Sequence, residues 1–184
     1  QIVGLTVLIG GVDQDDQGGA EALALKIVAR NPQQAFILVP ELQWHAIDAR
    51  VKGLRTVLDK HKCNYRIIAS DENQRQSTLK ALDSAMVEHG IPDVIIGTND
   101  RLAYVAYRYL IDAGHRVPED IGVTGFNAFD ADTILSPVLE SVQSPAYALG
   151  EEGGKALLSR LDTGSFDSAS LTLPVSPMRG TTLN

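Results

Sequence analysis

The chain of 184 residues contains one cysteine, Cys63, so no disulfide can form within it. A single thiol is typical of proteins from reducing compartments, and we expect a cytoplasmic protein. No apolar run is long enough to cross a bilayer, and no signal peptide is visible at the start of the sequence. The sequence therefore predicts a soluble domain with no membrane partner.

Basic residues are scarce, because 16 Lys and Arg stand against 23 Asp and Glu and the formal net charge is -7 at pH 7. A surface that binds DNA needs clustered Lys and Arg to neutralise phosphates. This chain alone is therefore a poor candidate for DNA binding. Its hydrophobic residues make up 44% of the sequence, which is enough to bury one good core or two small ones.

The signatures of common catalytic and metal sites are missing as well. The sequence has no GxxxxGK[ST] phosphate loop, no GxSxG nucleophile elbow and no GxGxxG fingerprint. Asp13, Asp15 and Gly18 fall at calcium-loop positions, but the final position holds Ala24 instead of glutamate. The four histidines are scattered, and none pairs with another at ligand spacing. We expect no metal, no cofactor and no enzymatic activity.

The stretch 92–127 carries the clearest pattern in the chain. Residues 93–97 form a short apolar run, which is typical of a strand buried on both faces. Residues 98–100 supply side-chain oxygens suited to a helix start, apolar residues then recur at helical spacing over 101–113, and Gly114 can end the helix. Residues 121–126 form a second apolar strand. Two strands joined by one helix should lie parallel with a right-handed crossover.

The rest of the chain alternates the same two patterns. Strands are predicted at 2–9, 34–39, 65–69 and 138–142, and extended segments at 171–175 and 179–183. Helices are predicted at 17–30, 46–61, 75–89 and 145–161, with a short one at 128–136. The expected buried side chains are Ala22, Leu25, Ile27, Val28 and Ala29 on the first helix and Leu79, Leu82, Met86 and Val87 on the third. This alternation predicts an α/β fold with a mostly parallel, doubly wound sheet and a flavodoxin-like lobe.

Four segments of the sequence resemble the effector-binding core of LacI/GalR-type bacterial repressors. They read PDVIIGTNDRLAYVAYRYLIDAG, HRVPEDIGVTGF, SPVLESVQSPAYALGEEGGKALLSRL and RGTTL, and the resemblance runs from about Asp13 to Leu183. RVPEDIGVTGF is the most specific, because periplasmic sugar-binding relatives usually lack it. The resemblance implies a periplasmic-binding-protein-like type I fold. It also implies a small-molecule effector, a sugar or nucleoside, that controls DNA binding allosterically.

The resemblance further implies how the chain is divided between two lobes. Residues 1–34 would be a remnant of the first lobe, and 35–142 the second lobe. Residues 143–163 would be a helix that returns to the first lobe, and 164–184 the closing strands of the second. Most of the first lobe and the DNA-binding headpiece are expected to be absent. DNA would then be bound only by the intact protein.

Candidate ligand-binding residues follow the carboxyl ends of the predicted strands, where open parallel sheets bind ligands. Arg50, three residues before Gly53, matches the family's effector-binding arginine, and its fork of donors suits two hydroxyls or a carboxylate. Trp44 offers a flat apolar platform for a sugar or base. Asn127 stands where most of the family carries aspartate. Simple packing of Trp44 and a surface position for Arg50 are the alternatives.

Asn99 and Asp100 align with a family pair that follows the strand at 93–97. One of them can bond ligand hydroxyls while the other caps the helix. We favour Asn99 as the ligand contact and Asp100 as the cap or a shared residue. Asp13 matches the start of the family's DNxxGG turn, and we expect it to position the following helix.

The helix at 101–113 has an unusually aromatic outer face. Tyr and Arg are enriched in protein contacts, and the same helix helps to pair subunits in the repressor family. We therefore expect a symmetric homodimer. The predicted interface residues are Tyr104, Tyr107, Arg108 and Ile111. Three alternatives stay open: Tyr107 packs sideways onto a neighbouring helix, the chain is a dimerising module without a ligand, or it is a periplasmic-type sugar-binding protein.

Overall fold

The computed structural model describes residues 11–42, 44–129, 137–165 and 170–183. The predicted strand at 2–9 and most of the predicted helix at 128–136 lie outside these residues. The chain forms two compact units. The larger consists of Asp16–Ser144 with Ser176–Asn184, and the smaller of Gln1–Asp15 with Pro145–Val175. Each unit is described below by itself.

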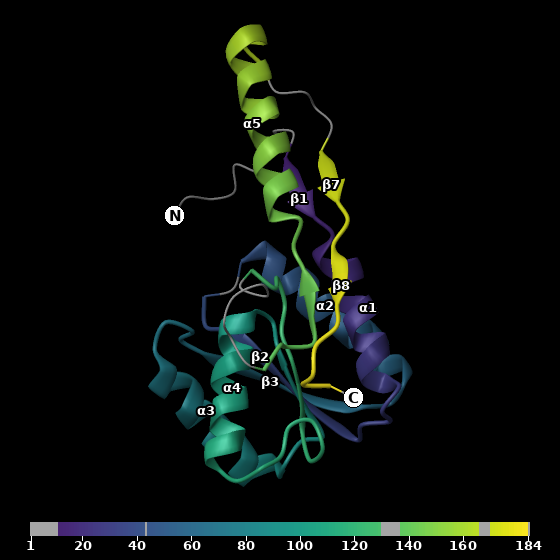
Figure 1. Cartoon of the computed structure of the whole chain (residues 1–184), viewed down its shortest axis with the longest axis vertical. Coiled ribbons are helices and arrows are strands. Elements are labelled where there is room, and N and C mark those ends of the chain that lie inside the picture. The colour runs from purple at the N-terminus through teal and green to yellow at the C-terminus, as the bar shows by residue number, and fades with distance from the viewer. Residues whose placement is uncertain (1–10, 43, 130–136, 166–169, 184) are drawn as a thin grey trace. The chain divides into compact units, whose positions relative to one another are not determined.

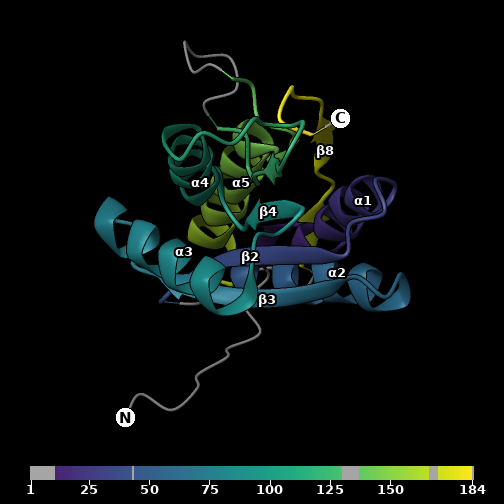
Figure 2. The same cartoon turned by 90° about the horizontal axis from the view of Figure 1, so that it is seen from below.

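The larger unit is built on a four-stranded parallel sheet in the order β3-β2-β4-β5. Its strands are β2 (Gln34–Pro40), β3 (Asn64–Ser70), β4 (Val94–Gly97) and β5 (Gly122–Thr124). Figure 2 shows β2 between β3 and β4. Parallel bridges from Thr124 to Glu140 and from Asn127 to Gln143 add a fifth segment beside β5. The predicted α/β class with a parallel sheet is confirmed.

The fifth segment leads into β6 (Ser141–Gln143), which pairs antiparallel with β8 (Ser176–Met178). Four helices belong to this unit: α1 (Asp16–Val28), α2 (His45–Lys60), α3 (Arg75–His89) and α4 (Asp100–Asp112) (Figure 1). The chain moves from β2 out to β3 and then back to β4, so right-handed crossovers place α2 on one face of the sheet and α3 and α4 on the other. α1 packs against α2, on the face of the sheet opposite α3 and α4.

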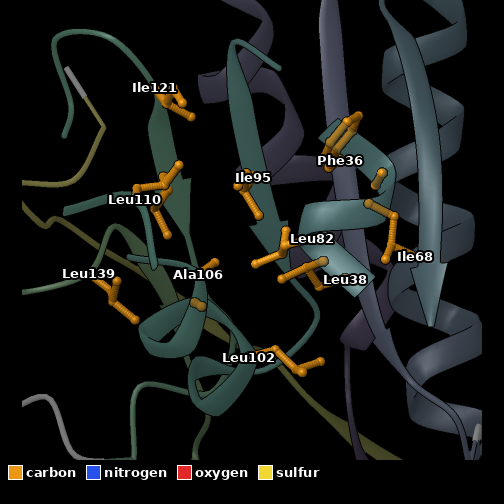
Figure 3. Close-up of a cluster of buried hydrophobic side chains, with 13 residues drawn as sticks. Phe36, Leu38, Ile68, Leu82, Ile95, Leu102, Ala106, Leu110, Ile121 and Leu139 are labelled. Carbon is orange, nitrogen blue, oxygen red and sulfur yellow. The ribbon is translucent and has the colours of Figure 1, made fainter. Parts of the chain in front are cut away.

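A cluster of buried apolar side chains joins the sheet to α3 and α4 (Figure 3). Leu82 of α3 points toward Leu38 of β2 and Ile95 of β4, and all three side chains are fully buried. Leu102 and Leu110 come from the inner stripe of α4. Burial of each such side chain stabilises the fold by about 1.5–3 kcal/mol. The helix that the sequence placed at 101–113 is thus held by its predicted apolar stripe.

The predicted buried face of α1 is partly wrong. Ile27 and Val28 are buried as expected, but Leu25 is 54% exposed. Ala22 and Ala29 are exposed as well, and the helix instead buries Gly19, Ala20, Leu23 and Ala24. α1 packs on α2, with Ala20 beside Gly53, so the helix is rotated away from the face that the sequence predicts.

The inner face of α3 is also shifted from the prediction. Leu82 is buried as expected, but Val87 is 89% exposed and Ala85 is buried in its place. The rotation follows from a polar contact, because the Thr78 hydroxyl lies 3.0 Å from the Ser70 hydroxyl at the end of β3. That buried pair fixes the first turn of the helix.

The smaller unit contains β1 (Val12–Gln14), which pairs parallel with β7 (Leu171–Leu173), and α5 (Ala146–Thr163). α5 buries none of its residues. β7 pairs with β1 in this unit, while α1 packs on α2 in the larger unit. Residues 179–183 form no strand. The assignment of the units to two lobes stays a prediction.

The two faces of α3 give a direct test of the packing. Leu82→Ala should lower the free energy of unfolding by about 2–5 kcal/mol, because it removes a fully buried side chain. Val87→Ala, on the exposed face, should change it by about 0.5 kcal/mol or less. Urea denaturation measures both values. An equal loss for the two variants would show that the orientation of α3 is wrong.

Candidate functional site

The candidate site lies at the carboxyl edge of the four-stranded sheet. Because the four strands are parallel, the loops that follow them leave from the same edge. The loop after β2 leads to Trp44, the loop after β4 carries Asn99 and Asp100, and the loop after β5 carries Asn127. The parallel sheet thus brings together residues that are far apart in the sequence, such as Arg50 and Asn127, which are 77 positions apart.

Arg50 joins three segments at this edge. It comes from α2, and only 5% of the residue is exposed. Its Nε donates to Asp16 Oδ1 at 2.7 Å, Nη1 donates to the Thr98 carbonyl oxygen at 2.7 Å, and Nη2 donates to Asn127 Oδ1 at 2.9 Å. The guanidinium therefore fixes the start of α1 and the ends of β4 and β5 relative to one another. Arg50 is not the surface arginine that was one of the two interpretations.

The ring of Phe126 forms one wall around the guanidinium. Its centroid lies 4.2 Å from Arg50 Cζ, within the range of a cation–π contact. Burial lowers the pKa of Arg50, and the Asp16 carboxylate acts in the opposite direction. The buried charge is therefore compensated by an ion pair and by an aromatic face.

Gly53 lies one turn after Arg50 on α2, at a place where α1 comes close to this helix. A Cβ at Gly53 would lie 2.4 Å from the Gln17 carbonyl oxygen and 2.9 Å from Ala20 Cβ. Only glycine allows α1 and α2 to approach this closely. The approach brings Asp16, at the start of α1, within hydrogen-bonding distance of Arg50.

The predicted roles of Asn99 and Asp100 need one correction. Asn99, not Asp100, caps α4, because its Oδ1 accepts a hydrogen bond from Leu102 N at 2.9 Å. The Asn99 side-chain amide also donates to Glu72 Oε2. Both residues are suited to a helix start, and Asn99 takes the cap because it precedes the first helical residue in an extended conformation. Whether Asn99 contacts a ligand stays a prediction.

Asp100 holds the loop that follows β5. Its carboxylate accepts hydrogen bonds from the Ser141 hydroxyl at 2.8 Å and from Ala128 N. A Cβ at Gly125 would lie 2.2 Å from Asp100 Oδ1, so the loop passes too close for any side chain there. Burial raises the pKa of Asp100 to about 6, and the hydrogen bonds from Ser141 and Ala128 limit the rise.

The backbone of Asn127 is held in an unusual conformation. Its φ is 96° and that of Ala128 is 50°, in a region that asparagine tolerates better than most residues. Asn127 N donates to the Val142 carbonyl oxygen at 2.8 Å, and the Asn127 carbonyl oxygen accepts from Ser144 N at 2.9 Å. These two bonds orient the side chain that accepts from Arg50.

Trp44 lies directly before α2 and is 51% exposed. Its half-exposed ring is consistent with a ligand platform, and that role stays a prediction. About half of the residue is covered, so simple packing of the ring stays the alternative.

The outer face of α4 is less exposed than the sequence indicates. Tyr104 and Tyr107 are partly buried and pack against the core cluster, and the Tyr104 hydroxyl donates to the Pro137 carbonyl oxygen at 3.4 Å. Arg108 pairs with Asp112, and Ile111 is 38% exposed. Sideways packing of Tyr107 onto a neighbouring helix stays the alternative. The dimer interface stays a prediction.

Sequence reasoning missed four residues at this edge. Asp16 is one of three aspartates at positions 13–16 and has no signal that distinguishes it, and Phe126 is predicted only as part of the strand at 121–126. The Thr98 carbonyl oxygen and the Ser141 hydroxyl have no sequence signal of their own. Spacing along the predicted strands places these residues near the edge, but it does not show which atoms meet.

Two depressions in the surface of the larger unit are lined by residues other than the candidate ligand-binding ones. One, of about 600 Å³, is lined by Lys26, Glu140, Arg179 and neighbouring residues, and another follows α2 beside Ile67. Within the described ranges, no group of three His, Cys, Asp or Glu side chains is arranged to hold a metal ion. Over the same residues, no helix combines the length and apolar character needed to cross a membrane.

Comparison with known proteins agrees with the fold. Residues 32–183 match the periplasmic binding protein-like domain family. The ribose operon repressor of Bacillus subtilis is 22% identical over 164 residues, which cover 89% of this chain and 50% of the repressor. Catabolite control protein A of Staphylococcus epidermidis is 25% identical over 168 residues, which cover 90% of this chain and 50% of that protein.

Among solved structures, a LacI family transcriptional regulator from Enterococcus faecalis V583 with bound ribose has a TM-score of 0.82 and 24% identity. The alignment covers 94% of this chain and 62% of that one, and at this identity it supports the fold alone. The chain spans about half the length of the curated relatives it matches. These relatives are transcriptional regulators and not enzymes, and the resemblance to LacI/GalR-type repressors is confirmed.

The raised pKa of Asp100 predicts a pH-dependent stability. The folded state binds the proton more tightly than the unfolded state, whose pKa is near 3.8, so this group stabilises the fold fully below pH ~4. That contribution, up to about 3 kcal/mol, is lost as the pH rises through ~6. Asp100→Asn should remove it. Urea denaturation at several pH values should therefore show that the free energy of unfolding of the variant, relative to that of the wild type, increases as the pH rises. A difference that does not change with pH would contradict the burial of this carboxylate.

Proposed function

The chain belongs to the periplasmic binding protein-like domain family, in the group of LacI/GalR-type regulators, and from this we propose that it binds a small polyhydroxylated effector, a sugar or a nucleoside. The site is the carboxyl edge of the sheet around Arg50 and Asn127. The observation that carries the proposal is the buried guanidinium fork at the switch point of a parallel sheet, where this class of fold binds ligands.

The chemistry of the edge suits hydroxyl groups. The three named bonds of Arg50 use three of its five N–H groups. Asn127 and Asn99 add amide groups, which both donate and accept. Trp44 is half-exposed and offers an aromatic face to the apolar side of a sugar ring. Relatives described with ribose support a sugar more than a base.

In the intact protein, the effector controls DNA binding. An effector that binds two arrangements of the lobes unequally shifts the balance between them, and the spacing of the DNA-binding headpieces changes with it. DNA is then contacted only by a headpiece outside this chain, which agrees with the net charge of -7. Such a regulator works in the cytoplasm.

Pairing of two copies through α4 is the second part of the proposal. Ile111 and Arg108 are the exposed residues of the predicted interface, and Tyr104 and Tyr107 lie beside them partly buried. A mixed surface of an apolar side chain, an arginine and tyrosine edges is typical of protein contacts. A symmetric dimer of this kind sets the distance between two headpieces.

Arg50→Lys tests the effector site. Lysine keeps the positive charge but loses the planar fork, so an effector that raises the melting temperature of the wild type should bind the variant roughly tenfold or more weakly. A thermal-shift screen of sugars, sugar phosphates and nucleosides identifies the effector, and titration calorimetry measures its affinity.

Arg55→Ala is the matched control. Arg55 lies on the same helix, is exposed and bonds the Tyr65 hydroxyl, so its loss should leave effector affinity unchanged. Equal affinities for the wild type and Arg50→Lys would remove Arg50 from the site. Equal losses for the two variants would point to a general loss of structure.

Ile111→Asp tests the dimer. Sedimentation velocity should show a dimer for the wild type and a monomer for the variant, because a charge on the pairing face must be desolvated on association. Val87→Asp, on the exposed face of α3, should remain dimeric. A monomeric wild type at the same concentration would disprove pairing through α4.

A further inference from the structure

A buried carboxylate cancels the charge of the arginine at the candidate site. Asp16 Oδ1 lies 2.7 Å from Arg50 Nε, and the exposed fractions of the two side chains are 11% and 6%. Because the two groups are so close and so buried, their opposite charges cancel, and the pair presents no net charge to a ligand. Asp100, a second carboxylate, also acts on Arg50, since its field raises the pKa of the guanidinium. The positive charge of Arg50 thus interacts with two carboxylates, Asp16 and Asp100.

The loops at the same edge add further negative charge. Glu41 follows β2, and Asp71 and Glu72 follow β3. Glu72 accepts a hydrogen bond from Asn99, so it lies beside the candidate ligand residues. Arg101 is a basic residue here, and its Nη1 donates to Asn73 at 2.8 Å. The described loops of this edge carry more acidic than basic residues.

We infer that Asp16 is a specificity-determining residue that selects uncharged polyhydroxylated ligands over phosphorylated or carboxylated ones. This inference rests on the proposed function. An anion placed against Arg50 has to be desolvated, and it is repelled by Asp16 at close range. Its attraction to Arg50 therefore does not offset the free energy of desolvation. A hydroxyl group fits the same pair, because it accepts from the guanidinium and donates to the carboxylate.

A purely structural role for Asp16 makes a different prediction. If the carboxylate only orients Arg50, its loss weakens every ligand alike. If it sets the charge of the site, its loss weakens neutral ligands and strengthens anionic ones. Asp16→Asn separates the two roles, because the amide keeps the size and one acceptor oxygen while the charge disappears.

The experiment uses matched ligand pairs: ribose with ribose 5-phosphate, glucose with glucose 6-phosphate, and glucose with gluconate, with inorganic phosphate as a further probe. Thermal shift and titration calorimetry measure binding to the wild type, to Asp16→Asn and to Asp48→Asn. Asp48 is exposed on the first turn of α2, so its substitution changes the net charge equally without touching Arg50.

The wild type should bind the neutral member of a pair more tightly than its anionic partner. Asp16→Asn should shift the ratio of the two affinities toward the anion by roughly tenfold or more, since like charges at close range cost several kcal/mol. Asp48→Asn should leave the ratio unchanged. The wild-type comparison holds even if Asp16→Asn folds poorly.

Three outcomes would overturn the inference. One is a phosphorylated or carboxylated ligand that binds the wild type as tightly as its neutral partner, which leaves the proposed function standing. Another is an equal loss of both ligands in Asp16→Asn, which assigns Asp16 a structural role. If no ligand of the panel binds the wild type, the proposed function fails and the inference with it.

Discussion

The larger unit depends on the pairing of one buried cation. The Arg50 guanidinium reaches the start of α1, the end of β4 and the end of β5 through three hydrogen bonds of 2.7–2.9 Å. A charge removed from water is tolerated only when it is paired and hydrogen-bonded. Loss of one partner from such a cluster costs about 3–5 kcal/mol, because the other charge stays buried without compensation. The guanidinium therefore ties the start of α1 to the carboxyl edge of the sheet.

Two glycines and a second carboxylate make this arrangement possible. Gly53 lets α1 approach α2, which brings Asp16 to Arg50, and Gly125 lets the loop after β5 pass beside Asp100. Asp100 then holds Ala128, while the backbone of Asn127 bonds to residues on either side of Gln143. Each polar group of the site is positioned by a neighbour that has its own fixed place. The result is a preorganised edge, which lowers the cost of ordering side chains on binding.

Much of this fold followed from the sequence, for a physical reason. Apolar runs and helical spacing identified β2 to β5 and α1 to α5, with end points within a few residues. Parallel strands share one carboxyl edge, so the closeness of Arg50 to the loops after β4 and β5 could be predicted and is confirmed. The sequence did not show which of several similar polar residues makes a given contact. All four residues at positions 13–16 are polar and three of them are acidic, and nothing in the sequence selects Asp16.

The sequence also did not predict correctly which faces of α1 and α3 are buried. α1 packs through small residues, so Leu25 is exposed although it is one of its largest side chains, and a hydroxyl pair turns α3 so that Val87 faces outward. The cap of α4 was assigned to Asp100 and belongs to Asn99, because both residue types can cap a helix. The packing of α1 on α2 joins segments that are distant in sequence, and the choice of the cap depends on the backbone conformation of Asn99, so neither follows from the residue types alone.

The most direct measurement of the central claim is the NMR signal of the Arg50 Nε–H group, followed during addition of an effector sugar. The structure predicts a slowly exchanging proton close to the ring protons of Phe126, and it predicts that the sugar shifts this signal and leaves that of Arg55 unchanged. An Arg50 signal that exchanges as fast as that of an exposed arginine, or one that does not respond to the bound sugar, would contradict the account.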